Sequence, residues 1–63
     1  MSAKPDWCVK LIDARENAGL SQSAVAKLFH VTKRMWQYYE AAKYRPNTFV
    51  LSQYMRKLKE LDR

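Results

Sequence analysis

The chain has 63 residues, of which 12 are lysine or arginine and six are aspartate or glutamate, giving a net charge of +6. This length predicts one domain, near the lower limit for a chain that folds without disulfides or metals. One cysteine excludes an intrachain disulfide, and with one histidine it excludes a zinc site built from these two residue types. No apolar run approaches the roughly 18 residues of a membrane span, and the first residues lack the hydrophobic region of a secretion signal. We therefore expect a cytoplasmic protein stabilised by helix packing or oligomerisation.

The positive charge is concentrated in the middle of the chain. Residues 1–19 are neutral overall, residues 20–47 carry a net charge of +4, and residues 48–63 carry +2. Such a field suits a polyanionic partner. A solvated basic surface would explain the charge alone equally well.

The first half of the chain predicts two helices joined by a short connection. With one glycine, two prolines and no alternating apolar pattern, the sequence favours helices throughout. The first helix is expected to begin near Pro5 and to bury Cys8, with Gly19 supplying the left-handed residue at its end. Ser21 is then placed to cap a second helix over about 22–29. Its inward positions are expected to be Val25, Ala26 and Phe29.

The second half predicts two more helices. His30 and Val31 make a turn, and Thr32 caps a helix over about 33–41. A basic loop ends at Pro46, and a final helix capped at Asn47 or Thr48 follows. The fold class expected is all-α, a compact four- to five-helix single domain spanning residues 1–63.

The helix over 33–41 separates into two faces. Trp36 and Tyr39 share the inward face, whereas Arg34, Gln37 and Tyr38 lie on the other face with Lys33 beside them. Lysine and arginine donate to guanine O6 and N7, and glutamine pairs with adenine N6 and N7, so the second face suits the edges of DNA bases. The alternative is an ordinary amphipathic helix with a solvated face.

An ordered set of residues between about Leu11 and Leu58 matches a known pattern. The residues that carry it are Gly19, Leu20, Ser21, Gln22, Val25, Ala26, Phe29, Val31, Thr32, Trp36, Tyr39, Glu40 and Pro46. The chain thereby resembles the Cro/C1-type helix-turn-helix repressors of phages and bacteria, which have a lambda-repressor-like fold. Residues 34–41 are especially similar to a phage-regulator variant in which a tryptophan and a second aromatic residue precede the glutamate.

The resemblance implies roles for individual residues. Those at the base edges would be Thr32, Lys33, Arg34, Gln37 and Tyr38. Those at backbone phosphates would be Gln22, Ser23, Lys43, Tyr44, Arg45 and Asn47. Gln22 would also brace the helix over 33–41. The resemblance also implies a structural ion pair between Arg15 and Glu40. The alternative is that Glu40 is an ordinary carboxylate on the surface.

Two positions depart from the family pattern, which has glycine where this chain has His30 and Ala42. Histidine tolerates positive φ comparatively well, so the first change should be mild. Alanine would be strained in a left-handed cap, so we expect the helix before Ala42 to end differently and the basic loop to be re-aimed. Leu28 is a smaller departure, an apolar residue where the family exposes a polar one.

The last helix carries an apolar stripe that is wide for so small a domain. The stripe consists of Leu51, Tyr54, Met55, Leu58 and Leu61. Because repressors of this family commonly dimerise through C-terminal elements, these residues are predicted to form the interface of a homodimer. The alternative is that the stripe closes the core of a monomer.

The function expected is a sequence-specific, DNA-binding transcriptional regulator, a small phage or mobile-element repressor acting as a homodimer on a palindromic operator. A first alternative is a protein-interaction module on the same scaffold, such as an antitoxin or a phage protein that binds a host factor. A second is an architectural DNA-binding protein without sequence preference. No enzyme activity, metal, cofactor, small-molecule ligand or membrane association is expected, because no catalytic constellation or phosphate-binding loop is visible.

Overall fold

The computed structural model describes residues 4–62, which form four helices and no strand. The helices are α1 (Asp6–Asn17), α2 (Gln22–Leu28), α3 (Lys33–Glu40) and α4 (Thr48–Glu60). The all-α prediction is confirmed, and α2 and α3 each end one residue earlier than the predicted 22–29 and 33–41. The two ends of the predicted domain, residues 1–3 and 63, lie outside the described residues.

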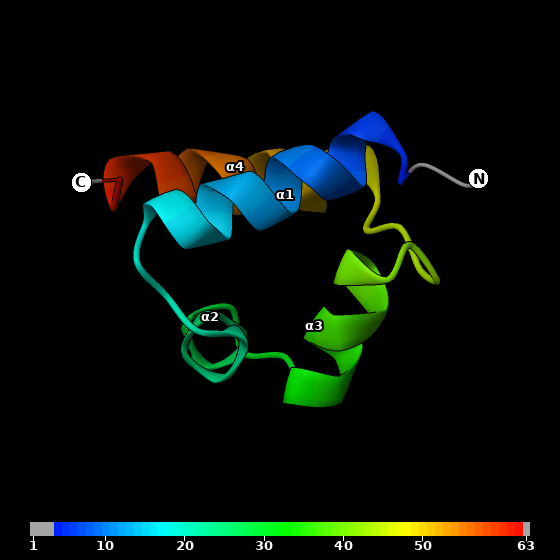
Figure 1. The fold of residues 1–63 in the computed structure, drawn as a ribbon, viewed down its shortest axis with the longest axis horizontal. Helices are drawn as coiled ribbons and strands as arrows, with labels where there is room; N and C mark the ends of the chain where they lie inside the picture. Colours follow the sequence, from blue (N-terminus) through cyan, green and yellow to red (C-terminus); the bar gives the residue numbers. More distant parts are fainter. Residues whose placement is uncertain (1–3, 63) are drawn as a thin grey trace.

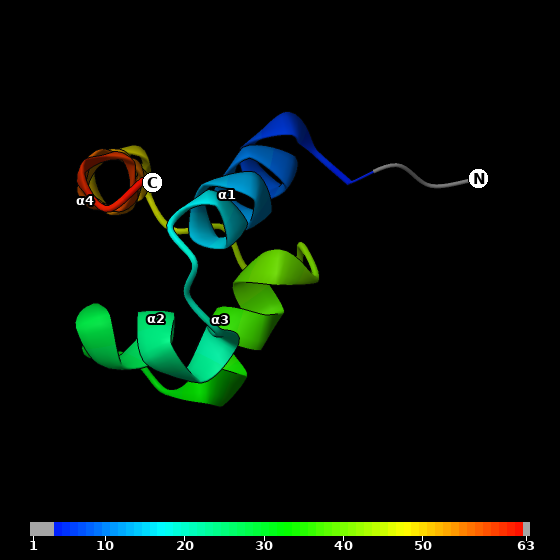
Figure 2. The same cartoon turned by 60° about the vertical axis from the view of Figure 1, so that its left-hand side comes forward.

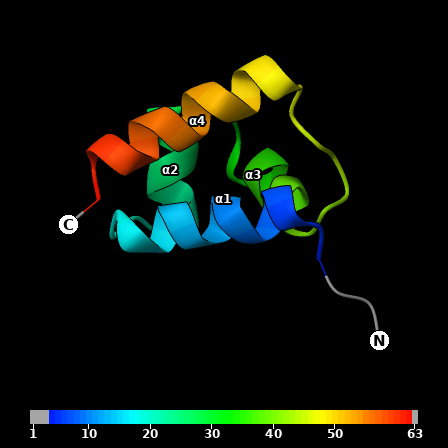
Figure 3. The ribbon, with the colours of Figure 1, turned by 90° about the horizontal axis from the view of Figure 1, so that it is seen from above.

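The helices form two layers (Figure 1). α1 and α4 lie in the upper layer and α2 and α3 in the lower one, as the turned view also shows (Figure 2). Seen from above, α1 and α4 run in roughly the same direction, with α2 and α3 beneath them (Figure 3). α2 packs against α3, and α1 packs against both α3 and α4. The helix-turn-helix pair is therefore held from one side only.

A tryptophan on α3 is the centre of the core. Trp36 is fully buried, and the ring centroids of Phe29, Tyr39 and Tyr54 lie 5.8, 5.7 and 5.6 Å from its own. These separations are in the range in which aromatic pairs stabilise beyond the area they bury. Since the four rings come from the end of α2, from α3 and from α4, they join the upper layer to the helix-turn-helix pair.

Three helices begin at the predicted side-chain caps. Ser21 Oγ, Thr32 Oγ1 and Asn47 Oδ1 accept the backbone N–H groups of residues 24, 35 and 50 at 3.1, 3.0 and 2.8 Å. Each bond satisfies an N–H group that the first helical turn leaves without a partner. The starts of α2, α3 and α4 are thus encoded locally.

The first three helices end in the same way, with one residue at positive φ. These residues are Gly19, His30 and Ala42, at φ 74°, 59° and 61°. In each case the next residue donates its N–H to the carbonyl oxygen five positions earlier, the Schellman arrangement. The bonds run from Leu20 to Arg15, Val31 to Ala26 and Lys43 to Tyr38, at 3.2, 2.9 and 2.9 Å. The expectation that Ala42 would make its helix end differently is wrong: the alanine adopts the conformation that a glycine would.

This conformation gives Ala42 an unfavourable backbone geometry that glycine would relieve. A left-handed residue with a Cβ atom costs about 1–2 kcal/mol, part of which glycine returns through its greater freedom in the unfolded chain. Ala42→Gly should therefore raise the free energy of unfolding by about 1 kcal/mol, and the melting temperature by about 4–8 °C. Thermal unfolding followed by circular dichroism measures this change.

The matched control is Ala41→Gly, one residue earlier. Ala41 has φ −88°, so glycine there gains no steric relief and should lower the melting temperature. Equal shifts in the two variants would contradict the account of the α3 end.

Candidate nucleic-acid interface

The exposed side of α3 carries the side chains predicted to read bases. Lys33, Arg34 and Gln37 are exposed and Tyr38 is half-buried, whereas Trp36 and Glu40 on the opposite side are buried. The two faces predicted for this helix are therefore present. Thr32 is exposed as well, and although its oxygen caps the helix, its hydroxyl proton remains free to donate.

The charges at the start of α3 are placed against the preference of the helix itself. A helix N-terminus carries a partial positive charge and favours acidic residues. The first turn of α3 contains no acid and begins with Lys33 and Arg34. Because local stability does not favour two cations there, their placement points to an anionic partner.

Glu40 fastens α3 to α1 and α2. Its Oε2 accepts hydrogen bonds from Arg15 Nε and Trp36 Nε1, both at 2.6 Å, and its Oε1 accepts one from Gln22 Nε2 at 2.9 Å. Arg15 also donates to the carbonyl oxygen of Leu20 at 2.8 Å. The pair expected from the family resemblance, Arg15 with Glu40, is thus present and largely shielded, with side chains 14% and 8% exposed.

These contacts lower the pKa of Glu40. Burial alone would raise the pKa of its carboxyl group, because the charged form loses water. Hydrogen bonds from Gln22, Arg15 and Trp36, together with the attraction of the guanidinium, outweigh that effect and hold the pKa below its ordinary value of 4.5. The carboxylate therefore stays ionised near neutral pH and accepts from all three donors.

Gln22 connects this buried group to the exposed face. It is the first residue of α2, and its Oε1 lies 3.4 Å from Gln37 Nε2. Of the two roles that the resemblance implies for Gln22, bracing α3 is consistent with this geometry, and contact with a phosphate stays a prediction. Ser23 is exposed beside it and is free to meet a phosphate.

The basic loop after α3 is tied to Tyr38. The ring of Tyr44 meets that of Tyr38 edge-on, with centroids 5.4 Å apart, and Lys43 Nζ lies 5.7 Å from the Tyr38 centroid. Arg45 is exposed and donates to the carbonyl oxygen of Pro46 at 3.3 Å. Asn47 uses its oxygen as the α4 cap, so only its amide N–H groups remain for a phosphate. The loop therefore presents donors next to α3.

The five residues predicted to form a dimer interface differ in how far they are exposed. Tyr54 and Leu58 are buried within the protomer, at 9% and 0% exposure, and burial raises the pKa of Tyr54 to about 12. In this conformation these two side chains close the protomer's own core and are not available to a second chain. Leu51 and Met55 are half-buried, and Leu61 is 38% exposed.

Two features were not predicted from the sequence. The Cys8 thiol, expected to be buried, lies 3.3 and 3.1 Å from the carbonyl oxygens of Tyr39 and Glu40 and so fastens α1 to the last turn of α3. Phe49, in the first turn of α4 and outside the predicted stripe, is 71% exposed. Its helical position, outside the row formed by residues 51, 54, 55 and 58, was the signal available.

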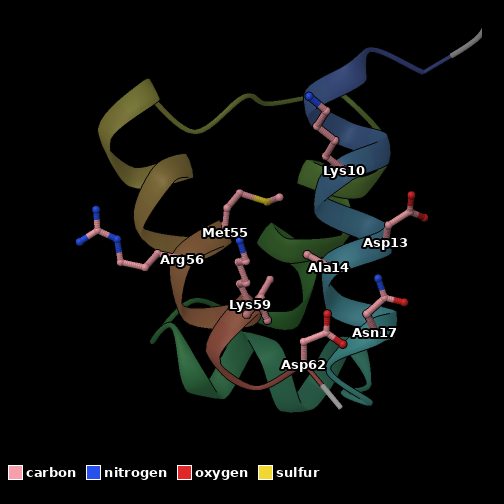
Figure 4. A pocket seen from close by; sticks show the side chains of 9 residues that line it. Lys10, Asp13, Ala14, Asn17, Met55, Arg56, Lys59 and Asp62 are labelled. Atoms are coloured by element: carbon pink, nitrogen blue, oxygen red, sulfur yellow. The ribbon is translucent and has the colours of Figure 1, made fainter.

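A groove of about 420 Å³ lies between α1 and α4 (Figure 4). α2 and α3 lie behind it in that view, so it opens on the side away from the helix-turn-helix pair. Lys10, Asp13 and Asn17 line it from α1, and Met55, Arg56, Lys59 and Asp62 line it from the other side. Its rim thus carries charges of both signs.

Within residues 4–62 no group of three or more histidine, cysteine, aspartate or glutamate side chains could hold a metal ion. None of the four helices is long and apolar enough to cross a membrane.

No curated protein and no solved structure matches the chain. A family model described as a helix-turn-helix domain matches residues 10–61, a segment that contains α2, the turn and α3. The chain therefore belongs to the helix-turn-helix domain family.

Proposed function

We propose that this chain is a sequence-specific, DNA-binding transcriptional regulator without catalytic activity. The observation that carries the proposal is the first turn of α3, where Lys33 and Arg34 are exposed at the helix end that favours anions. Membership of the helix-turn-helix family supports the same reading. In such domains the second helix of the pair enters the major groove with its N-terminal residues at the base edges.

The side chains on α3 match the chemistry of base edges. Arg34 and Lys33 would donate to guanine, and Gln37 would pair with adenine. Lys43, Arg45 and the Asn47 amide would meet the backbone phosphates that follow, because the loop carrying them is joined to Tyr38. Base contacts would supply specificity, and the loop would supply affinity and register.

We further propose that the regulator is a repressor of phage or mobile-element origin. Its resemblance to the Cro/C1 type supports this origin. Buried residues of all four helices form one core cluster, so the described chain would serve mainly to present α3 to DNA. Repression would then result from covering the promoter and excluding RNA polymerase.

A homodimer on a palindromic site is the assembly we propose. Since Tyr54 and Leu58 are buried, the contact would be made by Leu61 at the end of α4, with the half-buried Met55 and Leu51 on the same side of the helix. A two-fold dimer would place two copies of α3 about 34 Å apart, one turn of DNA.

Selection of bound sequences from random DNA tests these proposals together. We expect one enriched motif made of two inverted half-sites, with binding that weakens steeply as salt increases. Binding without any enriched motif would favour the architectural alternative. A motif lacking two-fold symmetry, with a monomer in sedimentation on and off DNA, would contradict the homodimer.

The protein-interaction module is the second candidate function, and the 71% exposure of Phe49 is the observation in its favour. Aromatic side chains are enriched in protein–protein interfaces relative to the rest of the surface. Absence of DNA binding at low salt, combined with loss of a co-purifying protein on Phe49→Ala, would support this candidate over the first.

A further inference from the structure

The hydrogen bonds between Glu40, Gln22 and Gln37 have a direction that their chemistry fixes. The ionised carboxylate of Glu40 has no proton and can only accept. Gln22 Nε2 lies 2.9 Å from Glu40 Oε1, so the amino side of the Gln22 amide must face the carboxylate. Its oxygen then faces the opposite way, toward Gln37.

The oxygen of Gln22 in turn sets the orientation of Gln37. The oxygen of Gln22 can only accept, so Gln37 must turn its amino group toward it, at a distance of 3.4 Å. One N–H of Gln37 is thereby occupied, and its second N–H and its oxygen are left for solvent or a ligand. Gln37 is exposed, so these remaining groups are accessible.

This leftover pair of groups matches one base better than the others. Adenine presents the N6 donor and the N7 acceptor in the major groove, whereas guanine presents two acceptors. An amide that offers one acceptor and one donor fits adenine. An amide with its oxygen engaged would offer donors only and would fit guanine.

We infer that Glu40 and Gln22 are positioning residues that make Gln37 read adenine. The buried carboxylate orients the Gln22 amide, and the Gln22 oxygen orients the Gln37 amide on the exposed face of α3. The inference rests on the proposed function and adds to it two residues that determine specificity without touching the base. Because the Gln22–Gln37 contact is long and exposed, it biases the orientation of Gln37 and does not lock it.

Two substitutions at Gln22 separate the direction of the hydrogen bonds from the presence of a side chain. Gln22→Met keeps the length of the side chain and removes both hydrogen bonds, so Gln37 turns freely. Gln22→Lys still donates to Glu40, but it also donates to Gln37, whose oxygen must then face inward. Gln53→Lys adds the same charge at an exposed position of α4 outside the predicted sites, and serves as the control for charge.

The experiment is a selection from random DNA with the wild-type protein, Gln37→Ala and these three variants. Gln37→Ala identifies the base position that Gln37 reads, where the wild type should prefer adenine. Gln22→Met should reduce that preference about five- to tenfold, the equivalent of one hydrogen bond. Gln22→Lys should shift the preference at that position to guanine, and Gln53→Lys should leave it unchanged.

The outcomes distinguish this inference from the proposed function. If the wild type yields a motif and both Gln22 variants keep its adenine preference, the inference is overturned and the proposed function stands. The inference is also overturned if Gln37→Ala changes no position of the motif. If the wild type yields no motif, both are overturned. Melting temperatures of all variants, measured in parallel, show whether a changed preference reflects a loss of folding.

Discussion

Glu40→Ala should leave the chain largely unfolded at 25 °C. The substitution removes the acceptor for Arg15, Gln22 and Trp36 at once. It leaves a shielded guanidinium without its buried carboxylate and a buried indole N–H without a partner. Removing one member of a buried ion pair costs about 3–5 kcal/mol. A core of this size supplies about the same total, so little stability would remain. Circular dichroism and urea unfolding measure the change.

Glu60→Ala is the matched control. Glu60 pairs with Lys57 across 3.8 Å, but its side chain is 61% exposed, so its loss should change the free energy of unfolding by less than about 0.5 kcal/mol. If Glu40→Ala still unfolds cooperatively, at the melting temperature of Glu60→Ala, the contacts of Glu40 do not stabilise the fold.

The same carboxylate gives stability a characteristic pH dependence. Its pKa is lower in the folded protein than its ordinary value of 4.5, so its contribution is fully present above pH 4.5 and is lost as the pH falls through the lower folded value. Unfolding free energies of the wild type should therefore fall below pH 4.5 more steeply than those of Glu40→Gln, which has no proton to bind there. Parallel acid profiles of the two proteins would contradict this assignment.

Arg34→Ala should weaken discrimination between the selected operator and random DNA by about 5- to 150-fold. Arg34 is exposed in the first turn of α3, where a bidentate contact with guanine contributes about 1–3 kcal/mol of discrimination. Competition binding with operator and scrambled duplexes measures the ratio. When the selection from random DNA is repeated with Arg34→Ala, the loss of base preference should be confined to one position of the motif.

Two other substitutions give the contrast. Lys43→Ala should weaken binding to all sequences alike and reduce the salt slope by about 0.9, the signature of a lost phosphate contact. Arg56→Ala removes an exposed cation on α4, outside the predicted sites, and should alter neither quantity appreciably. If Arg34→Ala keeps the wild-type ratio of operator to scrambled-DNA affinity, Arg34 does not read a base.

The starts of α2, α3 and α4 were predictable because short-range chemistry encodes them. Ser21, Thr32 and Asn47 act through hydrogen bonds to a residue three positions away, which a sequence shows directly. The end of α3 was not predicted, because the bias of alanine against positive φ is only about 1–2 kcal/mol and tertiary packing overrides it.

The arrangement around Glu40 was predictable in part. Family resemblance indicated the partner Arg15, and the i, i+4 spacing places Trp36 beside Glu40. Nothing in the sequence showed that the Gln22 amide would donate to the same carboxylate. The apolar row of α4 is a similar case. Hydrophobic periodicity shows which side of a helix is apolar, but not whether the protomer or a second chain covers it, and here Tyr54 and Leu58 are covered from within.

The position of Cys8 makes the single thiol a native reporter of conformational opening. With its sulfur fully buried against the carbonyl groups of α3, a thiol reagent reaches it only when α1 and α3 separate. The labelling rate then measures the free energy of that opening without any introduced probe. Operator DNA at a hundred times its dissociation constant would stabilise the closed form by about 2.7 kcal/mol and slow labelling about a hundredfold.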